Sequence, residues 1–174
     1  MNNMKNNISV IMSVYNDEKN VEIAIKSILN QSYKNFEILI MNDCSTDGTQ
    51  DKIDYYSKNA TNIRSFSNKV NLGLTKSLNI LIQNSKGSCI ARQDSDDFSD
   101  STRLEKQLRY ITDKGYDAVT SRALNIQTKV ARLADLEDIG FLGIQFVENN
   151  KKLKDKIAFG SKNISKENLE KAKN

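Results

Sequence analysis

Short apolar runs alternate along the chain with longer segments in which apolar residues recur every three or four positions. The runs are typical of buried strands and cover residues 8–14, 36–41, 62–66 and 88–92. The periodic segments predict helices in residues 21–29, 49–58, 74–82 and 104–111. Strands and helices that alternate at this spacing need crossover connections, so we expect the strands to run parallel. The sequence therefore predicts an α/β fold, with a mostly parallel sheet flanked by helices on both faces.

The alternation weakens after about residue 127. A fifth strand is expected within residues 117–127, the apolar segment 141–147 is ambiguous, and residues 165–173 predict a short polar helix. We therefore expect a core in residues 1–127, followed by a shorter segment in residues 128–174.

Polar residues follow three of the predicted strands, in segments 15–17, 42–43 and 92–97. Ligands of open parallel sheets bind beyond the carboxyl ends of the strands. These three loops are therefore expected to meet at one crevice.

The chain contains no histidine. This absence excludes Ser-His-Asp and Cys-His catalysis and zinc sites built on imidazole. Cys44 and Cys89 match no metal-ligand or redox spacing, so we expect a reduced, intracellular protein. Any catalysis must then use carboxylates, lysine, tyrosine or a metal ion held by oxygen.

Positive charge is concentrated at the end of the chain. The formal net charge is +4, and residues 151–174 contain eight lysines against Asp155, Glu167 and Glu170. This basic tail is typical of a solvated surface, and contact with acidic lipid or another anionic partner stays open. Nucleic acid is not expected as a partner, because arginine is not clustered. The first apolar run is too short to span a membrane, so we expect a cytoplasmic protein, with peripheral contact at the inner face of the membrane as the alternative.

Three carboxylates, those of Asp94, Asp96 and Asp97, lie directly after the fourth predicted strand. Their mutual repulsion must be relieved by solvent or by a cation. A solvated turn is one interpretation, because Asp and Ser favour turns. The other is Mg²⁺ or Mn²⁺ held by one or two carboxylates and by substrate phosphates.

A calcium loop is a third, weaker interpretation of the same residues. Asp94, Asp96 and Glu105 fall at positions 1, 3 and 12 of such a loop. Phe98 at position 5 has no ligand oxygen, and Ser99 at position 6 stands where the sharp turn needs Gly. The calcium interpretation is therefore disfavoured.

Four motifs carry a resemblance to a known family. They are, in chain order, ISVIMSVYNDEKNVEIAIKSILNQSYKNFEILIMNDCSTDGT, NLGLTKSLN, ARQDSDD and TRLEKQ. Over roughly residues 7–125 the chain resembles the nucleotide-binding half of family 2 glycosyltransferases, whose GT-A fold is Rossmann-like.

This resemblance implies a metal-dependent, inverting glycosyltransferase with Mn²⁺ or Mg²⁺ as cofactor. The donor would be a nucleotide-sugar, expected to be a UDP-sugar, and the acceptor a saccharide or lipid-linked glycan of envelope synthesis. Residues 1–127 would bind the nucleotide-sugar, and residues 128–174 would form a short, incomplete acceptor side.

Residues of the first predicted loop are implied in donor binding. In the stretch Val14, Tyr15 and Asn16, the tyrosine ring is expected to lie against the base. Glu18 is expected to hold this loop near the nucleotide. Packing of Tyr15 in the core stays open as the alternative.

Asp43 is implied as the acceptor of a hydrogen bond from uracil N3–H, and Asn71 and Gly73 as shaping the loop beside the nucleotide. The alternatives are that Asp43 caps the Asp-Gly turn and that residues 71–73 form a helix-entry turn without a ligand.

The acidic segment is implied as an Asp-x-Asp site made by Arg92, Asp94, Ser95 and Asp96. Asp94 would face the ribose or sugar, and Asp94 and Asp96 would hold the metal ion that binds the diphosphate. Ser95 would contact the donor from between them.

The sequence departs from the family at three positions in this half. Ser13 and a residue near Ser101 stand where the family usually has Pro, and Cys44 stands where it usually has Gly. Loop stiffness is expected to differ there.

The catalytic base is harder to place. Inverting members use a carboxylate far beyond the Asp-x-Asp site, and Asp138, in the sequence ADLEDIGF, is the candidate, lying about 40 residues beyond Asp97. Asp138 also reads as an ordinary surface acid. A nucleotide-sugar-binding module without transferase activity is therefore the alternative function.

Overall fold

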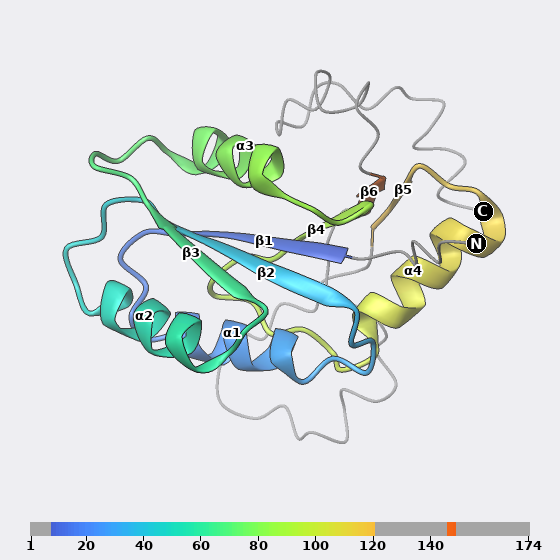
Figure 1. The fold of residues 1–174 in the computed structure, drawn as a ribbon, viewed down its shortest axis with the longest axis horizontal. Helices are drawn as coiled ribbons and strands as arrows, with labels where there is room; N and C mark the ends of the chain where they lie inside the picture. The colour runs from blue at the N-terminus through green and yellow to red at the C-terminus, as the bar shows by residue number, and fades with distance from the viewer. Residues whose placement is uncertain (1–7, 121–145, 149–174) are drawn as a thin grey trace, which may run out of the picture.

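The computed structural model describes residues 8–120 and 146–148. In these residues the chain forms one sheet with four helices (Figure 1). The strands are β1 (Ile8–Val14), β2 (Phe36–Asn42), β3 (Ile63–Ser67), β4 (Cys89–Arg92), β5 (Ala118–Val119) and β6 (Phe146–Glu148). The helices are α1 (Val21–Leu29), α2 (Thr49–Asn59), α3 (Leu74–Asn84) and α4 (Arg103–Lys114).

The strand order is β3-β2-β1-β4-β6-β5. β1 pairs in parallel with β2 and β4, and β2 pairs in parallel with β3, which confirms the predicted α/β class. β6 lies between β4 and β5 and runs antiparallel to both. The sequence left residues 141–147 ambiguous because a three-residue strand is too short to show a period.

Different helices cover the two faces of the sheet: α1 and α2 lie on one face and α3 lies on the other (Figure 1). Val10 and Met12 of β1 belong to the core cluster that includes residues of α1, α2 and α4, whereas Ile11 packs with Leu78 and Leu81 of α3. Successive side chains of a strand point to opposite faces. Because both faces are covered, β1 reads in the sequence as an unbroken apolar run.

Several expectations lie outside the described residues: the boundary at residue 127, the helix in 165–173 and the candidate base Asp138. Among the helices in residues 8–120, none has the length and apolar character needed to cross a membrane.

Candidate functional site

The parallel strands end at one edge of the sheet. Val14 pairs with Asn42, and Asn42 pairs with Ser67, so β1, β2 and β3 end level with one another. β4 ends where Arg92 pairs with Ile11. The loops after β1, β2 and β4, which the sequence predicted to meet, therefore emerge at the same edge of the sheet, with β4 ending three residues before the level of Val14.

Tyr15 is the first residue after β1, and 52% of its surface is exposed. The alternative that Tyr15 packs in the core, which the sequence left open, is therefore wrong. The side chain of Val14 is buried in the core, and the Val14 carbonyl accepts a hydrogen bond from Asp43 N–H at 2.8 Å. Val14 thus contributes its side chain to the core and its carbonyl to the hydrogen bond with the loop after β2.

Asn16 connects the loop after β1 to the loop after β2. Its φ of +51° lies in the left-handed region, which Asn tolerates better than most residues. Its N–H donates to Ser45 Oγ at 3.0 Å, and its Oδ1 accepts from Thr46 N–H at 2.8 Å. Asp17 N–H adds a third bond, to Thr49 Oγ1 at 2.9 Å. These bonds hold the two loops as one unit.

Glu18 makes two further contacts between the same loops. Its N–H donates to Asp47 Oδ2 at 3.1 Å, and its Oε2 accepts from Gly48 N–H at 2.7 Å. A Cβ added at Gly48 would lie 2.7 Å from that Oε2, so the absence of a side chain lets Glu18 approach. Glu18 therefore holds the loop, and its nearness to a nucleotide stays a prediction.

Asp43 ties a third loop to the end of β2. Its Oδ1 accepts from Leu72 N–H at 2.8 Å and from Asn68 Nδ2 at 2.7 Å, and its Oδ2 accepts from Gly73 N–H at 2.8 Å. The residue is 2% exposed. Its carboxylate binds residues 68–73 and not the turn at Asp47 and Gly48, so the Asp-Gly cap is not formed.

The charge of Asp43 is stabilised by these contacts. Burial by itself would raise the pKa of the carboxyl group, but the hydrogen bonds from Leu72, Asn68 and Gly73 outweigh it and lower the pKa. Asp43 is therefore ionised at neutral pH. A carboxylate has about four acceptor positions; Leu72, Asn68 and Gly73 occupy three, and the Ser77 hydroxyl hydrogen-bonds to the carboxylate as well.

Gly73 stands at the entry to α3 with φ +82°, a conformation that favours glycine. Its N–H also lies 3.1 Å from Asn71 Oδ1. Residues 71–73 thus form the helix-entry turn that the sequence left open as an alternative, and a contact with a nucleotide stays a prediction.

The acidic segment forms a tight turn after β4. Asp97 N–H donates to the Asp94 carbonyl at 3.2 Å. The guanidinium of Arg92 holds the Asp94 carboxylate through Nε at 2.9 Å and Nη2 at 2.8 Å. Burial raises the pKa of Asp97, and the charges of Asp94 and Asp96 raise it further. We call residues 94–97 the acidic turn.

Asp96 differs from Asp94 because its side chain is exposed and no hydrogen bond or ion pair joins its carboxylate to another described residue. In residues 8–120, no group of three or more Cys, Asp or Glu side chains is arranged to hold a metal ion. Mg²⁺ and Mn²⁺ commonly take only one or two protein carboxylates and complete their shell with water and phosphate oxygens. The donor set of Asp96 with Asp94 beside it fits that requirement.

Gln93 is a residue that sequence reasoning missed. It is fully buried, and its Nε2 donates to the carbonyls of Asp94 at 3.0 Å and Asp97 at 2.8 Å. Its Oε1 accepts from Ser99 Oγ at 2.6 Å and from Arg103 Nη1 at 2.9 Å. The alternation of β4 was the available signal, since a residue two positions after a core-facing strand residue also faces inward.

Arg103, in the first turn of α4, is 2% exposed, and burial lowers its pKa to about 9, with the charge of Asp97 acting in the opposite direction. Within the described part of the chain, its Nε and Nη2 have no hydrogen-bond partner. A positive charge is thus held beneath the acidic turn at neutral pH.

Glycosyltransferases are similar to this chain in sequence and in structure. The chain is similar to the O-antigen biosynthesis glycosyltransferase WbnJ of Escherichia coli, with 38% identity over 115 residues that cover 64% of this chain and 44% of WbnJ. It is similar in structure to S. aureus TarS 1-349 in complex with UDP, with a TM-score of 0.63 and 25% identity over 72% of this chain and 38% of that one.

The fold is also similar to that of the mannosyltransferase PcManGT from Pyrobaculum calidifontis, solved in complex with GDP-Man and Mn²⁺. The TM-score is 0.69 with 17% identity, over 87% of this chain and 46% of that one. The chain spans about two fifths of the length of the curated relatives it matches. The model of the family described as glycosyl transferase family 2 matches residues 9–165, and the chain therefore belongs to glycosyltransferase family 2.

Proposed function

We propose that this chain carries the donor site of a metal-dependent, inverting glycosyltransferase. The observation that carries the proposal is the exposed, unpartnered carboxylate of Asp96, at the same sheet edge as the exposed ring of Tyr15. A nucleotide diphosphate needs a cation at one end and an apolar face at the other. The complex of TarS with UDP supports a UDP-sugar as the donor.

The base of the nucleotide would lie on Tyr15, since an aromatic ring stacks on any base. Asp43 would accept a hydrogen bond from uracil N3–H, and its ionised state at the end of β2 supports this role. Asn71 and Gly73 would shape the loop next to the base, and Asn16 and Glu18 would keep the loop with Tyr15 in place.

Asp96, with Asp94 beside it, would hold the divalent cation, and the complex of PcManGT with Mn²⁺ supports this choice of ion. When bound, the cation supplies Lewis-acid stabilisation of the charge that develops on the leaving diphosphate. Arg92 orients the Asp94 carboxylate through two hydrogen bonds, and Ser95 lies between the two aspartates.

Transfer with inversion requires a carboxylate that takes the proton of the acceptor hydroxyl as its oxygen attacks the anomeric carbon. We assign this role to Asp138, which lies outside the described residues. The acceptor would be a saccharide or lipid-linked glycan of envelope synthesis, and the O-antigen role in the name of WbnJ supports this class. The lysine-rich segment 151–174 would contact the acidic lipids that carry such an acceptor.

Titration calorimetry with UDP, with and without Mn²⁺, tests the donor site. We expect the native chain to bind UDP only with Mn²⁺ and Asp96→Ala to abolish that binding. The control is Asp51→Ala, which removes an exposed aspartate from α2 and should leave the affinity unchanged. UDP binding that is equal with and without Mn²⁺, or unaffected by Asp96→Ala, would contradict the metal site. Tight UDP binding without any sugar transfer would favour the alternative of a nucleotide-sugar-binding module.

A further inference from the structure

We propose that Gln93 is a positioning residue for the donor site: its side-chain amide sets the shape of the acidic turn and thereby the direction of the Asp96 carboxylate. This inference rests on the proposed function. The two N–H groups of the amide bind the carbonyls of Asp94 and Asp97, the first and last residues of the turn. Asp96 lies between these two anchored points.

The orientation of this amide follows from the chemistry of its partners. Backbone carbonyls only accept hydrogen bonds, and an arginine guanidinium only donates them. Nε2 must therefore face the carbonyls of Asp94 and Asp97, and Oε1 must face Arg103. A flipped amide would place donor against donor at 2.9 Å in a fully buried position.

The oxygen of the amide, Oε1, is also held by hydrogen bonds. Arg103 and Ser99 both donate to Gln93 Oε1, so every hydrogen-bonding position of the amide is used. Ser99 is itself held by Ser27, whose Oγ accepts from Ser99 N–H at 3.1 Å. The acidic turn is thereby connected to α1 and α4, which are packed in the core.

The variant Gln93→Glu separates positioning from folding. A glutamate keeps the size of the side chain and the acceptor facing Arg103, so a buried ion pair replaces the hydrogen bond between the charged guanidinium and the neutral amide. It removes the donor from the carbonyls of Asp94 and Asp97, which then face a carboxylate oxygen. The added negative charge would attract the cation and repel the diphosphate directly, so faster exchange of Asp97 N–H is the result that assigns a loss of binding to displacement of the turn.

Gln31 offers a matched control. It is also a fully buried glutamine, and its Nε2 donates to the carbonyls of Ser27 at 3.2 Å and Asp100 at 2.6 Å. Its Oε1 accepts from Leu104 N–H at 2.9 Å. It therefore makes the same type of contact without touching residues 94–97.

The experiment measures Mn²⁺-dependent UDP affinity by calorimetry, together with the hydrogen exchange of Asp97 N–H in the free chain. For Gln93→Glu we expect an affinity at least tenfold lower and faster exchange of Asp97 N–H. For Gln31→Glu we expect a lower melting temperature, with affinity and Asp97 exchange unchanged. Ser99→Ala, which removes one of the two anchors of Gln93, should lower the affinity about threefold and serves as the second variant if Gln93→Glu does not fold.

Unchanged affinity and unchanged Asp97 exchange in Gln93→Glu would overturn the proposal, and so would equal losses in the Gln93 and Gln31 variants. The proposed function fails separately, if the native chain does not bind UDP with Mn²⁺. In that case the exchange of Asp97 N–H still decides whether Gln93 holds the turn.

Discussion

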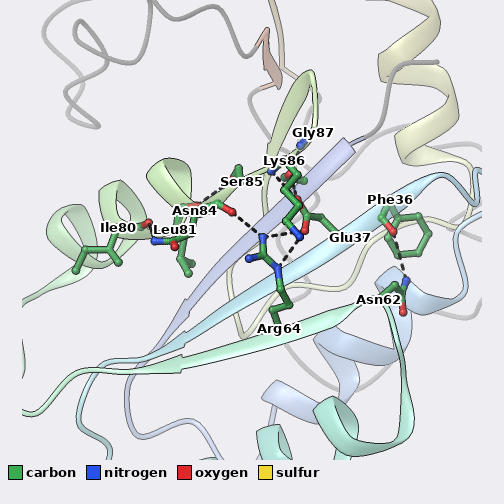
Figure 2. Close-up of polar contacts among 11 residues, drawn as sticks. Phe36, Glu37, Asn62, Arg64, Ile80, Leu81, Asn84, Ser85, Lys86 and Gly87 are labelled. Carbon is green, nitrogen blue, oxygen red and sulfur yellow. Dashed lines mark hydrogen bonds and ion pairs between the residues drawn. The ribbon is translucent and has the colours of Figure 1, made fainter. Parts of the chain in front are cut away.

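Arg64 of β3 places two donors on one carboxylate oxygen of Glu37 in the neighbouring strand β2, with Nε and Nη2 at 3.2 and 2.9 Å from Oε2 (Figure 2). The other oxygen, Oε1, accepts from Ser9 Oγ at 2.6 Å and from Lys86 N–H at 2.7 Å. Glu37 thus joins three strands and the segment after α3. This cluster lies at the amino end of the sheet, opposite the candidate site, so it contributes stability without taking part in binding.

Glu37→Gln should lower the free energy of unfolding at pH 7 by about 2 kcal/mol, because a charged acceptor with four donors around it is replaced by an amide with one oxygen. Urea unfolding measures this loss. Asp117→Asn, which changes an exposed aspartate beyond the end of α4, is the control and should change stability by less than about 0.5 kcal/mol.

The same residue makes stability depend on pH. Burial would raise the pKa of Glu37, but the hydrogen bonds from Ser9, Lys86 and Arg64 together lower it below its ordinary value. A carboxyl group whose pKa is lower in the folded state stabilises the fold above its unfolded pKa of about 4.3 and loses this contribution as the pH falls through the folded pKa. Unfolding of the native chain between pH 6 and pH 3 should therefore show a steeper loss of stability than unfolding of Glu37→Gln. Equal slopes would contradict this role.

Asp43→Asn should release the loop of residues 68–73. The amide has only one acceptor oxygen, so its NH₂ group would face the N–H of Leu72 or of Gly73, and the loss of one of these hydrogen bonds costs about 1 kcal/mol. Hydrogen exchange of these two amides should accelerate at neutral pH. In the native chain the same protection should persist above a pH of about 4 and be lost in more acidic solution, because the folded pKa of Asp43 is lowered. Unchanged protection of the Leu72 and Gly73 amides in Asp43→Asn would show that Asp43 does not hold this loop.

Cys44→Gly should stabilise the protein by about 0.5–1 kcal/mol. Cys44 has φ +65°, a left-handed conformation that costs a residue with a Cβ about 1–2 kcal/mol. Glycine removes this cost but loses more entropy on folding and gives up the weak contact of Cys44 Sγ with the Lys69 carbonyl at 3.6 Å. Thermal unfolding measures the change, and Cys44→Ala, which keeps a Cβ, should show no stabilisation. Equal effects of the two substitutions would rule out backbone strain as the cause.

Gly48→Ala and Glu18→Ala should be coupled. In the native background the added methyl group displaces the exposed Glu18 side chain and removes one hydrogen bond, a cost of about 1 kcal/mol. In the Glu18→Ala background no carboxylate stands in the way. Because Gly48 has φ −73°, which alanine adopts without strain, the substitution should then stabilise by about 0.5 kcal/mol. A double-mutant cycle in urea should give a coupling energy of about 1.5 kcal/mol, and additive effects would mean that Glu18 and Gly48 do not interact in solution.

The positions of the elements could be predicted from the sequence because they depend on local patterns. The run at residues 8–14 is β1, and the apolar period that begins at Val21 is α1. The segments that end the strands were also identified, since polar residues interrupt the apolar runs at Tyr15, Asp43 and Asp94. A strand was expected within residues 117–127, and β5 lies there at Ala118–Val119. The sequence did not decide the segment that contains β6, because a strand of three described residues is too short to show a period.

The sequence by itself determined the α/β class, the order of strands and helices along the chain, and the edge of the sheet where the carboxylates gather. Only the tertiary structure decided how each carboxylate is used. Asp43 is bound by backbone N–H groups about 30 residues away, the Asp94 carboxylate is held by Arg92, and Asp96 is left exposed. The physical reason is that hydrophobic periodicity specifies which face of an element is buried, whereas hydrogen-bond partners depend on where loops from distant parts of the chain come to lie once those faces are packed.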